Sequence, residues 1–264
     1  MKKVLLASVG ALAVCAALST TASATVSGTL SGSYASDTNG GNGDLWNLNG
    51  SLTGMVGGNW GLEGTGGYHS LSAGGGSNLD IWNIGGSVFW AGMQGRLAAT
   101  VNYYSTSTSG LDLNQTNYGV GGEWYAGPSF TVALKGGADT VNASAFGSSG
   151  SETGGYAGGM LQWYVMPNLA LSGAVDYSEF AGSHATTETA KVEWLFSQSM
   201  PVSVYGGYEH ADAGAGGFGG GGDAFFVGLK LYMNNPGGGT LVDRQRNGSL
   251  GYIAETPILG LSTN

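Results

Sequence analysis

Apolar and polar side chains alternate along most of this chain. In "FTVALKGGADT", residues 130–140, Phe130 and Val132 share one face of an extended segment, and Lys135 and Asp139 share the other, because successive side chains of a strand point to opposite sides. The same two-residue period recurs in further segments and predicts β-strands. The twelve predicted strands are residues 25–34, 45–55, 60–71, 79–90, 95–104, 113–126, 130–140, 154–165, 169–177, 188–196, 202–210 and 224–233.

The links between these segments alternate in length. Short links such as "MPN" at 166–168 follow long ones such as "VNASAFGSSGSE" at 141–152. This alternation is typical of an up-and-down barrel that crosses an outer membrane, with tight periplasmic turns and longer extracellular loops. An even number of strands places both ends of the barrel on the periplasmic side. We therefore expect an all-β fold, a transmembrane up-and-down antiparallel β-barrel of about twelve strands.

Charged residues within the predicted strands all fall on the face opposite the apolar one. This arrangement fits a soluble sheet, whose polar face meets water, and equally a membrane barrel, whose polar face lines the lumen. In a barrel, the lumen-lining charges are Glu63, Arg96, Glu123, Lys135, Asp139, Asp176, Lys191, Glu193, Glu209 and Lys230.

The tryptophans favour the membrane barrel. All seven lie on the apolar face toward strand ends, whereas the centres of the apolar faces hold Leu, Val, Ala and Gly. Amphipathic rings concentrate at the lipid–water boundary, while a soluble core would bury its largest side chains at strand centres. The predicted aromatic girdle consists of Trp46, Trp60, Trp82, Trp90, Trp124, Trp163 and Trp194.

The chain begins with the pattern of a secretory signal peptide. Two lysines precede an apolar stretch at 4–18, which is short for a membrane helix, and small residues at 22–24 supply a cleavage site. We therefore expect a signal peptide at 1–24, a transmembrane barrel at 25–233 and a periplasmic tail at 234–264. Export to the outer membrane of a Gram-negative bacterium, with both mature termini in the periplasm, follows from this organisation.

Composition excludes several functions. Cys15 is the only cysteine and would leave with the signal, so the mature chain would have no disulfide and no thiol chemistry. Without Lys2 and Lys3, six basic residues face seventeen acidic ones. This balance argues against nucleic-acid binding, which needs clustered Lys and Arg.

The predicted long loops carry carboxylates and no basic residue. Such a mouth should raise the local concentration of cations and give a channel a mild cation preference. The expected acidic mouth consists of Asp37, Asp44, Asp80, Asp112, Glu152, Glu179, Glu188, Asp212 and Asp223.

The lumen positions include many small residues, for example Gly85, Ser87, Gly119, Gly121, Ala133 and Gly207. We expect these positions to leave space for water, in a barrel wider than the eight-stranded kind whose side chains fill the interior. A channel for passive passage of ions or small polar solutes is therefore the leading prediction. The alternative is a structural or surface-interaction barrel without an open pore, in which lumen carboxylates neutralise Arg96, Lys135, Lys191 and Lys230.

Catalytic and metal-binding patterns are weak. His69 has lumen parity, His184 falls in a loop and His210 falls on the lipid side, but no Ser–His pair is visible within one segment. Loop carboxylates such as Glu179 with Glu188, or Asp212 with Asp223, could bind Ca²⁺, yet no EF-hand spacing is present. We predict no enzymatic activity, no catalytic residue, no metal site and no cofactor.

With these features in place, the chain resembles bacterial outer-membrane β-barrel proteins, including porins and smaller porin-like barrels, without a diagnostic motif for one family. The segment "FFVGLKLYM" at 225–233 is similar to their C-terminal assembly signal, although this chain continues for 31 residues beyond it. The resemblance implies outer-membrane lipid and lipopolysaccharide as surroundings. It also implies barrel-assembly machinery as a partner during insertion and small ions or solutes as passengers.

The C-terminal tail allows two hypotheses. It begins with a break at "NNPGGG", residues 234–239, and should leave the barrel wall there. A disordered periplasmic extension is the favoured interpretation. The alternative is a plug, in which Arg244 and Arg246 enter the lumen and pair with carboxylates such as Glu63, Glu123 or Glu193.

Overall fold

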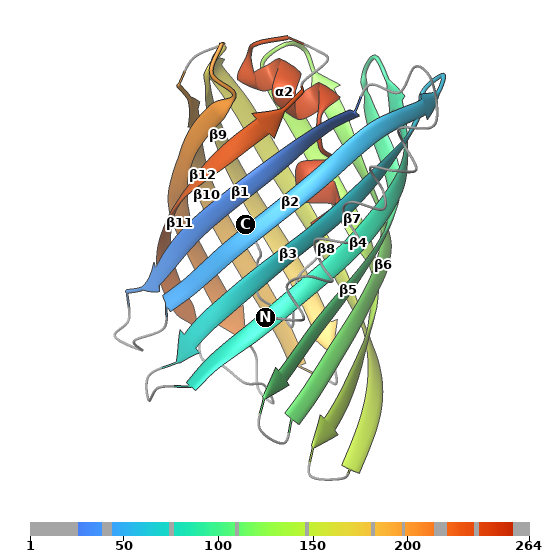
Figure 1. The fold of residues 1–264 in the computed structure, drawn as a ribbon, viewed down its shortest axis with the longest axis vertical. Helices are drawn as coiled ribbons and strands as arrows, with labels where there is room; N and C mark the ends of the chain where they lie inside the picture. Colours follow the sequence, from blue (N-terminus) through green and yellow to red (C-terminus); the bar gives the residue numbers. More distant parts are fainter. Residues whose placement is uncertain are drawn as a thin grey trace.

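Twelve strands close into an antiparallel barrel, as the sequence predicts (Figure 1). The computed structural model describes residues 26–38, 44–73, 77–108, 111–145, 148–180, 183–196, 199–213, 221–234 and 238–255. The predicted signal peptide and residues 256–264 lie outside these ranges.

Each strand follows its predecessor around the barrel. The strands are β1 (Val26–Asp37), β2 (Asp44–Gly57), β3 (Trp60–Ala73), β4 (Ser77–Gly92), β5 (Gly95–Thr108), β6 (Leu111–Ala126), β7 (Phe130–Ala145), β8 (Ser148–Met166), β9 (Leu169–Phe180), β10 (Ser183–Leu195), β11 (Val202–Ala213) and β12 (Gly222–Met233). A short helix, α2 (Leu241–Asn247), and a 3-10 turn, η1 (Gly251–Ile253), follow β12. Neither these nor any other helix in the described ranges is long and apolar enough to cross a membrane.

The first and last strands close the sheet. In β1, Leu30 lies opposite Leu231 of β12 on one side and opposite Gly50 of β2 on the other. Every strand therefore pairs with two neighbours, and the barrel has no open edge. Hydrocarbon offers no hydrogen bonds to unpaired backbone groups, so closure is the condition under which a sheet can span a bilayer.

Several strands extend beyond their predicted ends, most of all toward the expected long loops. β7 continues to Ala145 and β8 begins at Ser148, so most of the link predicted at 141–152 is strand. The apolar face gives way there to polar residues such as Asn142 and Ser144. The alternation of apolar and polar residues therefore ends before the ladder of backbone hydrogen bonds does.

Burial is inverted relative to a soluble protein. The outward side chains of Leu97 and Val120 are 62% and 67% exposed, whereas the inward amide of Asn117 is completely buried. A water-soluble monomer rarely exposes a continuous apolar surface of this kind. The outer surface of the barrel is suited to lipid and the inner surface to polar contacts.

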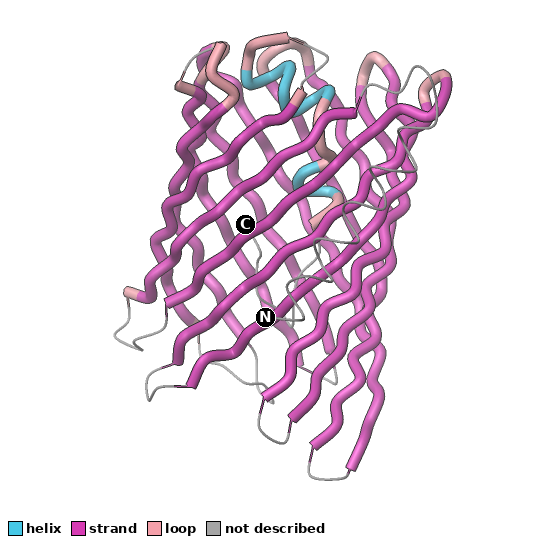
Figure 2. Tube along the Cα trace, viewed as in Figure 1, coloured by secondary structure: helices cyan, strands magenta, loops and turns pink. Residues whose placement is uncertain are grey.

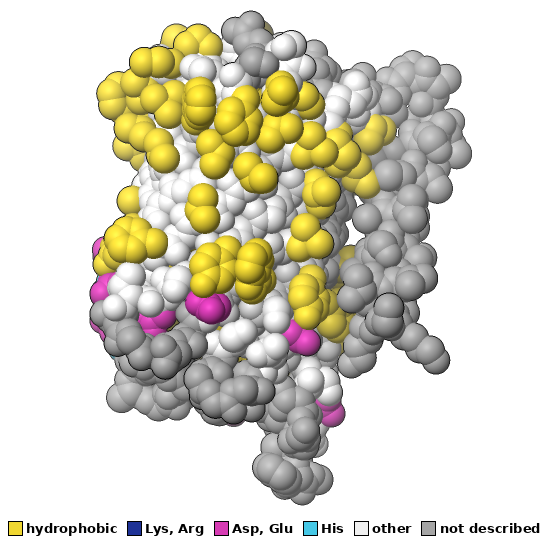
Figure 3. Space-filling view, turned by 60° about the vertical axis from the view of Figure 1, so that its left-hand side comes forward, with side chains coloured by type: hydrophobic (Ala, Val, Ile, Leu, Met, Phe, Trp, Pro, Cys, Tyr) yellow, Lys and Arg dark blue, Asp and Glu magenta, His cyan; other side chains and the backbone are white. Residues whose placement is uncertain are grey.

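Hydrophobic side chains gather in two bands on the face of the barrel that Figure 3 shows, and the tryptophans lie toward the two ends of the strands. Trp46 and Trp82 lie toward the long-loop end, and Trp60, Trp90, Trp124, Trp163 and Trp194 lie toward the short-turn end. All are exposed except Trp82, which is half-buried. Neighbouring rings support each other within a band, as in the stacked pair Phe130–Trp163, whose centroids are 6.1 Å apart.

Glycine permits the tight turns at the short-turn end. Gly58, between β2 and β3, has φ +53°, and Gly127, between β6 and β7, has φ +71°. Residues with a Cβ atom rarely adopt such values. The described turns and helix α2 share this end of the barrel (Figure 2).

We predict that the short turns are periplasmic. Cysteines introduced separately at Asn142, near the long-loop end of β7, and at Asn168, in the turn between β8 and β9, should label differently. In intact cells an impermeant maleimide should react only with the first variant, and both should react after the outer membrane is permeabilised. Equal labelling in intact cells would contradict this orientation.

Candidate functional site

The ten charged side chains predicted for the lumen lie on the inner surface of the barrel. Alternation along each strand places all of them on the inward face: Glu63, Arg96, Glu123, Lys135, Asp139, Asp176, Lys191, Glu193, Glu209 and Lys230. The four basic residues lie in the half of the barrel nearer the short turns. The C-terminal tail enters this same half (Figures 1 and 2).

Arg96 joins the barrel wall to the tail. Its guanidinium donates to Glu123 Oε2 through Nε at 2.9 Å and through Nη2 at 2.7 Å. The same group donates to the carbonyl oxygens of Gln245, Gly248 and Ser249 at 3.0, 2.8 and 3.1 Å. These carbonyls lie at and just beyond the C-terminus of α2, where backbone acceptors lack helical partners and a cation is favourable.

Glu63 holds the next residue of the tail. Its Oε2 accepts a hydrogen bond from the backbone N–H of Leu250 at 2.8 Å and another from Thr53 Oγ1 at 2.6 Å. The carboxylate is 3% exposed, and a buried charge needs such donors to offset its lost hydration.

Lys135 and Asp176 hold η1. Lys135 Nζ donates to the carbonyl of Glu255 at 2.8 Å, pairs with Asp176 at 3.0 Å and lies 3.8 Å from the centre of the Tyr252 ring. The Tyr252 hydroxyl donates to Asp176 Oδ1 at 2.9 Å. Burial, with Asp176 nearby, raises the pKa of Tyr252, so its hydroxyl remains a donor.

Helix α2 closes much of the short-turn end. Thr240 and Asp243 form a capping box at its N-terminus, and the N–H of Leu241 donates to Pro167 O at 2.7 Å. Leu241 is fully buried. It packs in a cluster with Tyr164, Ala170, Leu195 and Tyr232 of the wall.

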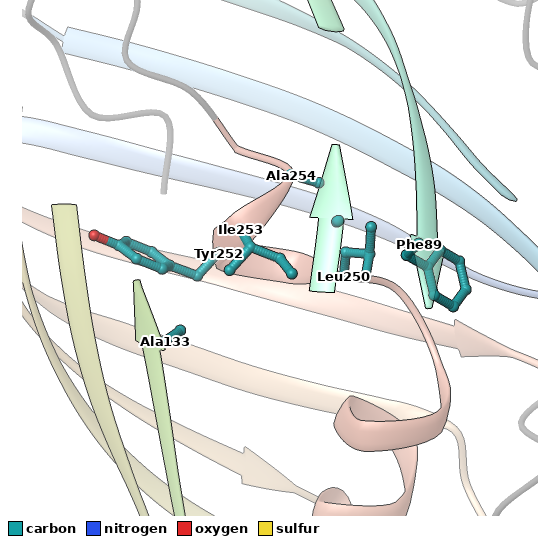
Figure 4. Packing of buried hydrophobic residues seen from close by; sticks show 7 residues of the cluster. Phe89, Ala133, Leu250, Tyr252, Ile253 and Ala254 are labelled. Carbon is teal, nitrogen blue, oxygen red and sulfur yellow. The ribbon is translucent and has the colours of Figure 1, made fainter. Parts of the chain in front are cut away.

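The segment after α2 makes an apolar contact deeper in the lumen. Figure 4 shows Leu250, Ile253 and Ala254 of the tail with Phe89 and Ala133 of the wall. Ala98 and Tyr252 complete this buried cluster. Residues 240–255 are therefore a folded plug, which we call the tail plug, and the favoured prediction of a disordered extension was wrong for them.

The tail arginines do not make the contacts that the plug hypothesis assigned to them. Arg246 donates to Phe130 O at 2.7 Å and lies over the Tyr125 ring at 4.5 Å, and Arg244 lies over the Tyr232 ring at 5.7 Å. The proposed carboxylate partners bind other groups. Glu63 accepts from Leu250, Glu123 from Arg96, and Glu193 from Gln245. Arg96 of the wall, rather than Arg244 or Arg246 of the tail, makes the most hydrogen bonds between the wall and the tail.

The small lumen residues do not leave space for water as expected. A Cβ atom at Gly119 would lie 2.2 Å from the Tyr156 hydroxyl, at Gly85 1.8 Å from Asn102 Oδ1, and at Gly207 2.7 Å from the Phe226 ring. A Cβ atom at Gly121 would lie 2.9 Å from Cβ of Ile253 in the tail plug. Ala133 and Ser87 are buried too. Larger side chains facing these positions fill the space.

The expected mouth carboxylates lie on strand ends at the long-loop end. Asp44, Asp80, Asp112, Glu179, Glu188, Asp212 and Asp223 occupy outward-facing positions, and Asp37 and Glu152 occupy inward-facing ones. Several accept hydrogen bonds from outward hydroxyls, as Asp44 does from Tyr34 at 2.7 Å and Asp80 from Ser70 at 2.7 Å. Acidic side chains lie beyond the aromatic band of that end in Figure 3.

The histidines are separate from one another. His69 Nδ1 and Nε2 lie 2.8 Å and 3.2 Å from Asn47 Oδ1 and Asn83 Oδ1 in the lumen, and His210 Nδ1 lies 2.7 Å from Asp223 Oδ1 on the outer face. Within the described ranges, no three His, Cys, Asp or Glu residues are grouped so as to bind a metal ion.

A cavity of about 140 Å³, lined by both polar and apolar side chains, remains between the tail plug and the wall. Its lining includes hydroxyl and amide side chains of β1–β4, such as Ser51 and Asn49, and charged side chains of β10 and β12, such as Lys191 and Lys230. The interior is therefore narrowed without being filled completely.

Comparisons with solved structures agree with this geometry. The NanC porin aligns with a TM-score of 0.56 at 10% identity, covering 77% of this chain and 98% of that one. An outer membrane channel from Pseudomonas putida F1 aligns at 0.54 and 14% identity (79% and 94% covered), and the KdgM porin at 0.53 and 10% identity (77% and 98% covered). The fold is that of outer-membrane porins. Neither a protein-family model nor a curated protein matches this chain in sequence.

Gly121→Val should expel η1 from the lumen, because the new side chain would overlap Ile253, whose Cβ lies 2.9 Å from the position of an added Cβ atom. Trypsin cleavage after Arg244 and Arg246 should then become about tenfold faster or more, with the barrel still folded. Gly173→Ala is the matched control, because its added Cβ would face outward, 3.9 Å from the nearest atom. Equal cleavage of both variants would contradict the packing of η1.

Proposed function

We propose that this protein is a porin-like channel of the bacterial outer membrane, through which ions or small polar solutes pass passively and which its own tail plug narrows. The cavity beside the plug, whose lining includes many hydroxyl, amide and charged side chains, carries the proposal. An apolar core would close a barrel of this size, whereas hydroxyl, amide and charged groups favour a hydrated path.

The outer surface of the barrel supports a membrane location. The outward apolar belt and its two aromatic bands support insertion in the outer membrane, with both ends of the barrel periplasmic and export through the signal at 1–24. Lipopolysaccharide beside the outward carboxylates, and barrel-assembly machinery during insertion, are the partners we expect. We propose no catalytic role; the lumen histidine, His69, lies against the amide oxygens of Asn47 and Asn83.

A structural or surface-interaction barrel without an open pore is the second candidate. The observation in its favour is the extent of tail contact, because Arg96, Glu63 and Lys135 all bind backbone groups of the plug. A permanent plug would leave the outer loops as the only interacting surface.

Deleting residues 236–264 should raise single-channel conductance severalfold, because the plug occupies the short-turn half of the lumen. The protein would be refolded into a planar bilayer, and slower gel migration of the heat-denatured protein would verify that the truncated barrel folds. The full-length channel should show a small resolved step. No step from either protein at any voltage would favour the structural barrel.

Cations should be mildly preferred in low salt. Asp37 and Glu152 face inward at the long-loop end and the other seven carboxylates surround the opening, so their field should concentrate cations there. Screening beyond a Debye length of about 8 Å at physiological salt should weaken the preference in concentrated KCl.

Reversal potentials in a KCl gradient measure this preference. Asp37→Asn with Glu152→Gln should reduce it more than the matched outward pair Asp80→Asn with Asp112→Asn. Anion preference of the unmodified channel in low salt would reject the proposal.

A further inference from the structure

Two lysines share one side of the lumen cavity. Lys191 of β10 and Lys230 of β12 both line it. Their Nζ atoms lie 5.9 and 5.7 Å from the centre of the same ring, that of Tyr205 on β11 between them. Two ammonium groups near one ring in a confined space repel each other unless anions neutralise them.

Glu193 is the wall carboxylate that pairs with Lys230, and its hydrogen-bonding capacity is largely used. Glu193 Oε1 accepts from Ser203 at 2.6 Å and from the Tyr232 hydroxyl at 2.5 Å, and Oε2 accepts from Gln245 at 3.2 Å. Lys230 approaches Oε2 only to 3.8 Å, which is too far for a hydrogen bond.

Two further donors in the cavity lack partners. Lys191 forms no hydrogen bond or ion pair with any part of the chain that the structure describes. Thr189, two residues away on the same face of β10, also lines the cavity and is 8% exposed, and its buried hydroxyl has no partner. A buried hydroxyl and an ammonium group left unpaired cost free energy that a bound anion would recover.

Two further carboxylates lie near this region and would compete with a bound anion for the lysines. Glu209 lies opposite Thr189 in the pairing of β10 with β11. Glu255, the last described residue of the tail, lines the cavity. Its backbone carbonyl is held by Lys135, whereas its carboxylate makes no hydrogen bond or ion pair with the described residues. The tail thus carries a carboxylate of its own near the two lysines.

We propose that Lys191, Lys230 and Thr189 form a binding site for a small carboxylate anion in the lumen. A carboxylate offers two oxygens with several lone pairs, so it can accept from both ammonium groups and the hydroxyl at once, whereas a halide offers one spherical acceptor. The cavity volume of about 140 Å³ limits the ligand to a few heavy atoms beside the plug.

Acetate is the probe, titrated calorimetrically into the full-length barrel in detergent micelles at low ionic strength, with chloride as the comparison anion. This measurement needs no open pore, so its outcome is independent of the channel proposal. Saturable binding below about 100 mM acetate is expected, with weaker binding of chloride.

Lys191→Gln should weaken acetate binding about tenfold or more, because a charge-assisted hydrogen bond is lost. Lys191→Arg should restore most of it, and Glu255→Gln should retain it. Heat-modified gel migration of each variant would verify folding. Equal acetate affinity of Lys191→Gln and the unmodified protein, loss of binding in Glu255→Gln, or no saturable binding would each overturn the site.

Discussion

Closure of the sheet is the constraint on which the rest of this structure depends. β1 pairs with β12 along most of its length, and the backbone is thereby satisfied within a medium that offers no hydrogen bonds. Closure fixes which face of every strand meets lipid. The apolar positions must then point outward, and the charges in the membrane-spanning part of the strands must point into a shared lumen.

Charged side chains in a lumen need hydrogen-bonding partners, either water or polar groups of the protein. In the half of the barrel nearer the short turns, the tail plug supplies such partners. The backbone carbonyls at the C-terminal end of α2 accept hydrogen bonds from Arg96. The Leu250 amide donates to Glu63, and the Glu255 carbonyl accepts from Lys135. These contacts use backbone groups of the tail, so they depend on its path more than on its side chains. Inward glycines such as Gly121 then make room for the apolar side of the plug.

Strand number and the face of most strand side chains were predictable, because side chains in a strand alternate between its two faces. The predicted alternation of long and short links was wrong, because strands continue into several of the expected loops: β5 ends at Thr108 and β6 begins at Leu111. Strand ends were not predictable, because residues such as Asn142 and Ser144 lie beyond the apolar belt while still in the ladder. For the same reason the outward orientation of Asp44 and Asp112 was hidden, because both residues lie just outside the predicted strands.

The sequence indicated only part of the structure of the tail plug. The pair Thr240 and Asp243, which forms the capping box of α2, was a local signal of a helix start. The partners of Arg96 could not be anticipated, since backbone carbonyls carry no sequence pattern. Lumen glycines were misinterpreted because a missing side chain in one strand says nothing about the ring that faces it, as Tyr156 faces Gly119.

The central claim is that η1 packs against the inner wall of the folded barrel. A disulfide tests it directly: a Cβ atom at Gly121 would lie 2.9 Å from Cβ of Ile253, close enough to bridge after a small shift. Gly121→Cys combined with Ile253→Cys should cross-link under oxidising conditions, in a chain whose only native cysteine is Cys15. Gly173→Cys with Ile253→Cys, which places the wall cysteine on the outer face, should not. Absence of the first cross-link in the folded barrel, or equal cross-linking of both pairs, would contradict the account.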